Sequence, residues 1–467
     1  MKYVSTRGEA PVLAFDDVLL AGLATDGGLY VPAEWPHFST TDFAAMAGLS
    51  YSEIAFHVIR PFVGGTVTDD ALIRMIDDSY AGFGHPAVAP LRQIGSNEWL
   101  LELFHGPTLA FKDFALQLVG RMFDHVLAAR GERVTIIGAT SGDTGSAAIE
   151  ACRDRDNVDV FILFPRGRVS PVQQRQMTTV DSSNVHAIAV EGTFDDCQDL
   201  VKAAFNDAQF RTAHGLSAVN SINWARVLFQ IVYYVVAAVR LGAPERKVAF
   251  AVPTGNFGNV LAGWAAWKCG LPVERLVIGT NSNDILFRFF ETGEMAMAGV
   301  EPTLSPSMDI QVSSNFERLL FDMLDGDGAA VRRWIGDFRA TRRISVDDVR
   351  LGRAREMFSA ARLDDEGTKR VIREIYETTG ELLDPHSAIG VDAARQKRGD
   401  PAVPMVSLAT AHPAKFPDAV EAATGIRPAL PERMADLFDR AERFETLPND
   451  IAAVQQYIRT NVRDVAA

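Results

Sequence analysis

The stretch RVTIIGATSGDTGSAAIEAC, residues 133–152, carries the pattern that decides the fold class. Its first part, RVTIIG (133–138), is a short apolar run rich in β-branched residues, which is typical of a buried strand. A glycine-rich turn follows, and from Thr144 to Cys152 the pattern becomes that of a helix. A strand that leads through a tight turn into a helix is the building unit of α/β proteins.

The same alternation of strand and helix recurs along most of the chain. Further strands are expected at VFILFP (160–165), HAIAVEG (186–192), KVAFAVP (247–253), LVIGTN (276–281) and MVSLAT (405–410). Helices are expected at Asp195–Phe205 and Val260–Cys269. This order predicts an α/β fold whose sheets contain many parallel strands.

The first 85 residues differ from the rest of the chain. They contain helical patterns at Asp42–Leu49 and Tyr51–Phe62, and the Gly- and Pro-rich segment AGFGHPAVAPL (81–91) is typical of a domain boundary. A chain of 467 residues is also longer than one hydrophobic core usually supports. We therefore expect an N-terminal domain over residues 1–85, and two α/β subdomains with a C-terminal helical extension over residues 90–467.

Composition narrows the class of protein. The net charge of −14 argues against nucleic acid as a partner, because phosphate backbones require clustered Lys and Arg. No apolar run has the roughly 18 residues of a membrane span, and the start of the chain lacks a signal-peptide pattern. Three separated cysteines and nine scattered histidines predict neither disulfides nor a metal site. A cytoplasmic protein without a metal is expected.

Two glycine-rich turns stand where strands are expected to lead into helices. They are GATSGDTGSAA (138–148) and PTGNFGN (253–259). Glycine lets the backbone approach a ligand closely, and the free N–H groups at the start of a helix attract anions. Neither turn is a P-loop or a GxGxxG dinucleotide motif. Each could also be a tight turn that uses glycine for packing.

The segment HGPTLAFKDFALQ (105–117) places Lys112 among apolar residues. Burial disfavours the ammonium form, which lowers the pKa of the amine and makes it a nucleophile. A lysine amine condenses with an aldehyde, and pyridoxal phosphate is an aldehyde with a phosphate tail, so it needs one such lysine and one anion-binding loop. The alternative is a lysine that extends its charged end into water at the end of a helix.

Several motifs together resemble the threonine synthase family. They are HGPTLAFKDFALQ, ATSGDTGSAA, PTGNFGN, LDPHSAIG (383–390) and ATAHPAKF (409–416), in that order. YVSTRGEAP, DGGLYVP (26–32) and DIQVSSNFERLL (309–320) are similar to the longer form found in bacteria and fungi. The resemblance runs nearly end to end. It implies a type II fold of pyridoxal-phosphate enzymes, related to the tryptophan synthase β chain, with the cofactor in the cleft between two α/β domains.

The resemblance implies a set of cofactor ligands. Pyridoxal 5'-phosphate would form a covalent Schiff base with Lys112, which would also carry protons. The cofactor phosphate would lie in the loop of Gly255, Asn256, Phe257, Gly258 and Asn259. Thr410 would bind the pyridine nitrogen, and Asp143 stands where many relatives place an asparagine beside the phenolic oxygen. Many family members carry aspartate where this chain has Asn259, which a backbone cradle should tolerate.

The implied reaction is the last step of threonine biosynthesis. O-phospho-L-homoserine would lose its γ-phosphate and take up water at Cβ, giving L-threonine and phosphate. The α-carboxylate would lie at Ser141, Gly142, Asp143 and Thr144. Candidates for the substrate phosphate are Ser221, Asn223 and Arg226, with Lys415 and Arg318 as further candidates, although Arg226 could instead lie on an exposed helix surface. No role is assigned to His105, His386 or His412.

Three alternative functions are open at this point. A serine or threonine dehydratase of the same fold would use the same lysine on a substrate without phosphate. A non-catalytic paralogue would bind the cofactor alone. A phosphotransferase would need Lys-Ser/Thr after a glycine loop and acidic magnesium ligands, which the sequence lacks. A monomer or a homodimer is expected, with a small molecule as the partner.

Overall fold

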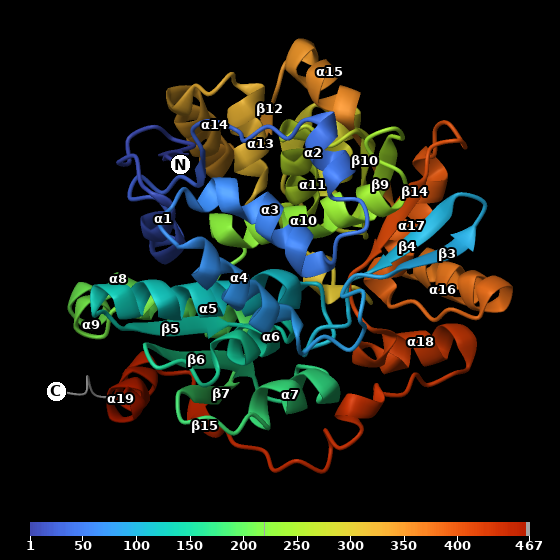
Figure 1. The fold of residues 1–467 in the computed structure, drawn as a ribbon. Coiled ribbons are helices and arrows are strands. Elements are labelled where there is room, and N and C mark those ends of the chain that lie inside the picture. Colours follow the sequence, from blue (N-terminus) through green and yellow to red (C-terminus); the bar gives the residue numbers. More distant parts are fainter. Residues whose placement is uncertain (219, 464–467) are drawn as a thin grey trace.

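Two largely parallel β-sheets with flanking helices make up most of the computed structural model, which describes residues 1–218 and 220–463 (Figure 1). One sheet has five strands in the order β15-β7-β6-β5-β8, and all its neighbours are parallel. The other has six strands in the order β13-β10-β9-β14-β4-β3, and its one antiparallel pair is β3–β4. The predicted α/β class with many parallel strands is confirmed.

The five-stranded sheet is covered by helices on both faces. Its strands are β5 (Val134–Ala139), β6 (Val158–Pro165), β7 (Val185–Glu191), β8 (Leu216–Ser217) and β15 (Glu445–Pro448). The helices of this half are α5 (Lys112–Arg130), α6 (Asp143–Cys152), α7 (Pro171–Thr178), α8 (Phe194–Asn206), α9 (Ala208–Ala213) and α19 (Ile451–Asn461). The strands and helices predicted here from apolar patterning are present, with ends that differ by one or two residues.

The pleat of a strand explains why both faces of this sheet are covered. Successive side chains point to opposite faces, so a strand that is apolar at every position needs cover on both. Ile137 and Phe161 lie in a cluster with residues of α8 and α19. Their neighbours Ile136 and Val160 join the main core with residues of α5 and α6.

The six-stranded sheet is built in the same way. Its strands are β3 (Leu91–Gly95), β4 (Glu98–Glu102), β9 (Val248–Pro253), β10 (Val273–Thr280), β13 (Phe358–Arg362) and β14 (Met405–Ala409). Helices α10 (Trp224–Arg240) and α11 (Gly258–Lys268) share the main core with one face, and α17 (Pro385–Lys397) packs on the other. The remaining elements of this half are α12 (Ile285–Thr292), β11 (Glu294–Ala296), η1 (Pro306–Met308), α13 (Phe316–Met323), α14 (Gly328–Thr341), β12 (Arg343–Ser345), α15 (Asp348–Met357), α16 (Asp365–Thr379), η2 (Pro413–Lys415), α18 (Pro417–Thr424) and η3 (Glu432–Met434).

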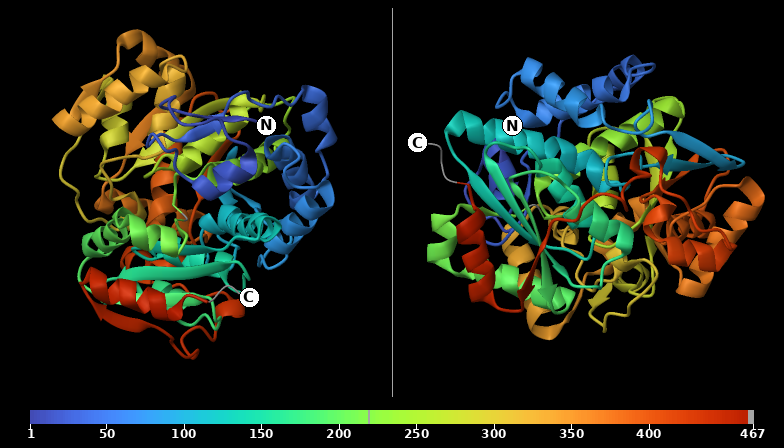
Figure 2. Two further views of the ribbon diagram at one scale, coloured as in Figure 1. Left: turned by 90° about the vertical axis from the view of Figure 1, so that its left-hand side faces the viewer. Right: turned by 90° about the horizontal axis from the view of Figure 1, so that it is seen from below.

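The C-terminal segment was expected to be a helical extension, but it also contributes a strand to the five-stranded sheet. After α18 the chain returns to the five-stranded half, as the red segment in Figure 2 shows. There β15 pairs in parallel with β7 and forms the edge of the sheet, and α19 packs on α8. The strand was missed because it has only four residues, ETLP, which are too few to show a period. Among the described residues, no helix is both long and apolar enough to cross a membrane.

The N-terminal residues form a small, mainly helical unit against both halves (blue in Figure 1). Its elements are β1 (Tyr3–Ser5), α1 (Phe15–Ala21), β2 (Tyr30–Pro32), α2 (Thr40–Ala45), α3 (Tyr51–Val63) and α4 (Asp69–Tyr80). Helix α3 packs on α10, and α4 packs on α5. The structure has no regular element between α4 and β3, and the boundary at residues 85–90 stays a prediction.

A buried ion pair fastens this N-terminal unit to α13. Arg7 donates from Nε and Nη2 to the two carboxylate oxygens of Glu317 over 3.0 and 2.9 Å, and Thr6 Oγ1 donates to Glu317 over 2.7 Å. Both charged side chains are at most one-tenth exposed. Removing one partner of such a pair leaves an uncompensated buried charge, which costs about 3–5 kcal/mol.

Glu317→Leu is therefore expected to lower the thermal unfolding midpoint by roughly 3–5 °C, because a chain of this size loses about one degree per kcal/mol. Differential scanning calorimetry is the measurement. The control is Glu274→Leu, which breaks the exposed pair with Lys247 and is expected to leave the midpoint unchanged. Equal midpoints for the two variants would show that the buried pair does not stabilise the protein.

Candidate active site

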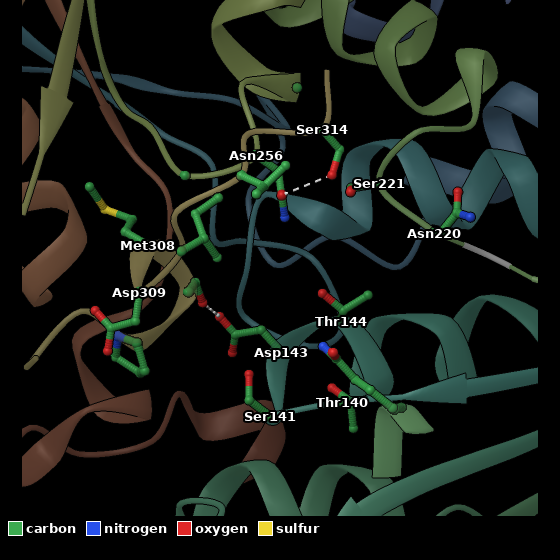
Figure 3. Close-up of a pocket in the computed structure, with 18 of the residues that line it drawn as sticks. Thr140, Ser141, Asp143, Thr144, Asn220, Ser221, Asn256, Met308, Asp309 and Ser314 are labelled. Carbon is green, nitrogen blue, oxygen red and sulfur yellow. Dashed lines mark hydrogen bonds between the residues drawn. The ribbon is translucent and has the colours of Figure 1, made fainter. Parts of the chain in front are cut away.

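A cleft of about 1780 Å³ lies between the two halves of the molecule. The starts of α5, α6, α10 and α11 and the segment around η1 line it. Figure 3 shows side chains of the five-stranded half facing those of the other half across this space. Among the labelled ones, Thr140, Ser141, Asp143 and Thr144 lie on one side, and Asn220, Ser221, Asn256 and Ser314 lie on the other. The cleft therefore collects residues that are distant in sequence.

Lys112 is the first residue of α5 and lines this cleft. The segment before it runs antiparallel to the end of β14, where Phe111 N donates to Thr410 O over 2.9 Å and His412 N donates to Leu109 O over 3.0 Å. These bonds hold the end of HGPTLAFKDF beside ATAHPAKF. They place Lys112 and Thr410 at the same end of the cleft.

The Lys112 side chain is buried, with 9% of its surface exposed, so it does not extend into water. Its Nζ lies 3.3 Å from Asp143 Oδ2. Burial lowers the pKa of Lys112, Asp143 acts in the opposite direction, and the net pKa lies below the ordinary value. The structure thus shows the burial and the lowered pKa that the sequence indicated for Lys112, although its Nζ lies beside a carboxylate.

Asp143 lies at the start of α6, and its carboxylate is held between two lysines. Lys415 Nζ lies 2.8 Å from Oδ1, and Gln173 Nε2 donates to the same oxygen over 2.9 Å. Burial alone would raise the pKa of Asp143, but the two ammonium groups outweigh it and hold this pKa well below the usual range. Ser307 Oγ, from the opposite side of the cleft, donates to Oδ2 over 3.4 Å.

The loop of residues 255–259 is shaped as an anion site at the start of α11. Two of its carbonyl oxygens accept hydrogen bonds from neighbouring side chains. Ser313 Oγ donates to Gly255 O over 2.6 Å, and Asn315 Nδ2 donates to Asn256 O over 3.1 Å. Within the described residues, no backbone N–H of 255–259 has a partner. Phe257 is held at φ 64°, an uncommon angle for a residue with a side chain, where it packs on Phe316.

Asn259 adds a side-chain donor to this loop. Its Oδ1 accepts hydrogen bonds from Tyr233 and Tyr234 over 2.6 and 2.9 Å. Its Nδ2 is buried and has no partner in the described part of the chain. Because the carbonyl end is occupied, the N–H₂ group is the end that is available to an anion.

Thr410 follows β14 and lines the cleft with His386. Its backbone N–H donates to Ser387 Oγ over 3.1 Å, and Ser387 in turn donates to Asp384. His386 Nδ1 lies 2.8 Å from Asp384 Oδ1. The LDPHSAIG motif therefore fixes the backbone that carries Thr410, a positioning role that the sequence did not reveal.

The start of α6 presents part of the predicted carboxylate site. Ser141 and Thr144 line the cleft, whereas Gly142 does not. Gly142 has φ 138°, and a Cβ there would lie 2.3 Å from the amide carbon of Gln173. Its N–H donates to Thr140 Oγ1 over 2.9 Å. Gly142 thus shapes the turn. The Asp143 side chain points to the two lysines, so only the backbone N–H of Asp143 is suited to a carboxylate.

The three candidate residues for the substrate phosphate lie at the start of α10, and not all of them line the cleft. Ser221 and Arg226 line the cleft, but Asn223 is absent from its lining. Asn223 instead caps α10 through Ala225 N and donates to Leu19 O over 2.8 Å. A direct contact of Asn223 with substrate is therefore not supported, because both ends of its amide are used in holding α10 in place.

Arg226 is 4% exposed, so the alternative of an exposed helix position is wrong. Nε and Nη1 of its guanidinium are buried without a partner among the described residues. Burial lowers its pKa to about 10. A buried guanidinium that faces a cleft without a counter-ion is suited to an anionic ligand.

Two further candidates prove to be structural. Arg318 is buried away from the cleft, where it donates to Tyr30 O over 2.9 Å and to Asn315 and Ile222 O. Lys415 is fully buried and bonded to Asp143, so it cannot reach a substrate phosphate. Sequence patterning marks a lysine near a motif but does not show which way its side chain turns. No group of three His, Cys, Asp or Glu side chains in the described part of the chain is arranged to hold a metal ion.

Three family models match successive parts of the chain. The model described as "Threonine synthase N terminus" matches residues 2–80, that of "Pyridoxal-phosphate dependent enzyme" matches 85–336, and that of "Threonine synthase, C-terminal" matches 387–458. Gly255–Asn259 and Lys112 lie within the second match and Thr410 within the third.

Individual relatives match nearly the whole chain. A threonine synthase from Pseudomonas aeruginosa is 58% identical over 98% of this chain and 98% of its own. The crystal structure of a pyridoxal-phosphate-bound threonine synthase from Brucella melitensis has a TM-score of 0.98 and 57% identity, covering 99% of this chain and 100% of that one. A yeast threonine synthase structure has a TM-score of 0.94 and 41% identity, with 98% of both chains covered.

Proposed function

The chain belongs to the threonine synthase family, and from this we propose that it converts O-phospho-L-homoserine and water into L-threonine and phosphate. It is a pyridoxal-phosphate-dependent lyase of the type II fold. The observation that carries the proposal is the position of Lys112, a buried amine at the end of a cleft whose walls are the starts of α6, α10 and α11.

The residues present fit pyridoxal phosphate. A phosphate at residues 255–259 would meet backbone N–H groups at the start of α11 and the Nδ2 of Asn259, none of which has a partner among the residues that the structure describes. Lys112 supplies the amine for the aldehyde. Thr410 and Asp143 line the same cleft, so each can meet the ring. A hydroxyl at the pyridine nitrogen, as Thr410 offers, leaves that nitrogen less protonated than a carboxylate would.

When bound, the cofactor supplies an aldehyde for the amine of the substrate and a ring that stabilises negative charge at Cα. The protein must then move protons at Cα, Cβ and Cγ. Lys112 is the base at Cα, since its lowered pKa makes the neutral amine easier to form than in a lysine exposed to water. Asp143 fixes the direction of Nζ through their 3.3 Å contact.

The two anionic ends of the substrate require two separate sites. The N–H groups and hydroxyls of Ser141 and Thr144 at the start of α6 suit the α-carboxylate. Arg226, with Ser221 beside it, suits the γ-phosphate, because a guanidinium can donate two parallel hydrogen bonds to phosphate oxygens. Arg226 would stabilise the charge that grows on the phosphate as it leaves.

The test is to incubate the purified protein with O-phospho-L-homoserine and measure phosphate and threonine. Equal amounts of both are expected. L-Threonine and L-serine are offered separately as substrates. Formation of 2-oxobutyrate or pyruvate from these, without phosphate release from O-phospho-L-homoserine, would overturn the proposal in favour of a dehydratase. Binding of the cofactor with no turnover of any substrate would indicate a non-catalytic paralogue.

Gly255→Ala tests the proposed phosphate loop. An added Cβ would lie 2.8 Å from Ser307 O and 3.2 Å from Met308 Cα, so the segment around η1 must move. Such overpacking costs about 1–3 kcal/mol, and we expect cofactor affinity to fall by about 5- to 150-fold. Titration of the cofactor-free protein with pyridoxal phosphate measures it. The control Gly336→Ala meets nothing within 4 Å and should keep the affinity of the parent protein.

We infer a cytoplasmic location and a monomer or a homodimer. The three cysteines are buried free thiols, which are typical of a reducing compartment. Size-exclusion chromatography with light scattering would assign the oligomeric state. A mass above that of two chains would contradict the inference.

A further inference from the structure

Lys415, in the 3₁₀ helix η2, is a charged side chain close to Lys112 to which the proposed reaction assigns no task. Its side chain is 0% exposed, so neither substrate nor water reaches it in this structure. Its Nζ lies 2.8 Å from Asp143 Oδ1 and donates to Thr108 O over 2.8 Å. Lysine is almost never fully buried unless it is paired, and a purely structural contact could be made without a charge.

The three groups form a row of alternating charge. Lys112 contacts one oxygen of Asp143 over 3.3 Å, and Lys415 contacts the other over 2.8 Å. Arg226 from α10 is the further charged group that faces Lys112. Asp113 on α5 faces Lys415. Around Lys112, therefore, one carboxylate is shared by two lysine side chains.

Resting on the proposed function, we propose that Lys415 is a positioning residue that balances the charge of Asp143, so that Asp143 orients the Lys112 amine without holding it as an ammonium ion. A carboxylate alone beside a lysine favours its charged form, in which the amine is neither nucleophile nor base.

The physical direction of each effect follows from the geometry. Asp143 raises the pKa of Lys112, and Lys415 lowers it. Removal of Lys415 should therefore raise the pKa of Lys112, and removal of Asp143 should lower it. Removal of both should leave the pKa of Lys112 near its present value. If Lys415 only held Thr108 in place through its hydrogen bond, the two removals would not shift the pKa of Lys112 in opposite directions.

The experiment is a pH titration of the visible absorption band of the holoprotein without substrate. Lys415→Met is expected to raise the pH midpoint of the band by about one to three units, and Asp143→Asn to lower it by a similar amount. The double variant Lys415→Met/Asp143→Asn should return towards the parent midpoint. Lys415→Arg should also stay near the parent, because it keeps the charge.

A second readout uses the cofactor-free protein. The rate at which added pyridoxal phosphate condenses with Lys112 rises with pH as the amine loses its proton, so its midpoint should shift in the same directions. Either single variant leaves a buried charge without its partner and can fold poorly. In that case the double variant should fold better than Lys415→Met, which itself supports the pairing.

A folded Lys415→Met protein whose two midpoints equal those of the parent would overturn the proposal, and so would shifts of the same sign in both single variants. Lys247→Met, which removes an exposed lysine paired with Glu274, is the matched control and should shift neither midpoint. Because neither readout contains substrate, failure here is distinguishable from failure to produce threonine from O-phospho-L-homoserine.

Discussion

Lys112→Ala is expected to lower kcat for O-phospho-L-homoserine by about 10⁴-fold or more, because a positioned proton-transfer group alone contributes up to that factor. No other lysine can take its place. Lys415 is enclosed behind Asp143, and the cleft-lining Lys202 is 65% exposed and paired with Asp199. Phosphate release in a coupled assay measures the loss.

Two observations separate this result from simple loss of cofactor. Borohydride reduction of the parent protein followed by peptide mass analysis should place the cofactor mass on Lys112, and the alanine variant should retain no reduced cofactor. The control Lys202→Ala should change kcat less than threefold, since its ammonium lies in water at the rim. A Lys112→Ala protein within tenfold of the parent kcat would refute the central assignment.

The fold could be predicted where a segment is buried on both faces. VFILFP and VAFAVP (248–253) lie in strands in which every side chain is buried, so composition alone marks them. β15 could not be predicted, because its four residues form a strand only by pairing with β7, and 253 residues of sequence lie between Glu191 and Glu445. The N-terminal unit also depends on contacts between distant residues, such as Arg7 with Glu317.

The sequence predicted which residues form the site but not where their side chains point. Lys112, Thr410 and the loop 255–259 all line one cleft, as the resemblance implied. Lys415 was placed near the substrate because it stands in the ATAHPAKF motif, and Asn223 because its position matches one near the phosphate in shorter relatives. Their side chains turn inward instead, one to cap α10 and one to Asp143. Side-chain direction is set by tertiary packing, which a single sequence does not display.

Arg226→Met is expected to lower kcat/KM for O-phospho-L-homoserine by about 10²- to 10³-fold. Two charge-assisted hydrogen bonds to a phosphate are together worth about 3–4 kcal/mol, and each 1.4 kcal/mol is a factor of ten. Arg226→Lys keeps a charge but loses the planar fork, so an intermediate loss is expected. Binding of L-2-aminobutyrate, followed by the absorption change of the cofactor, should be unchanged, since that amino acid has no phosphate.

The same substitution should make the free protein more stable. Arg226 is buried without a partner in the described part of the chain, and that burial lowers its pKa to about 10, so the folded protein bears a desolvation cost that methionine removes. A gain of about 1–3 kcal/mol is expected, seen as a higher thermal unfolding midpoint without ligand. Inorganic phosphate should raise the midpoint of the parent more than that of Arg226→Met. A variant that is less stable, or that binds phosphate as the parent does, would show that Arg226 serves packing and that the substrate phosphate binds elsewhere in the cleft.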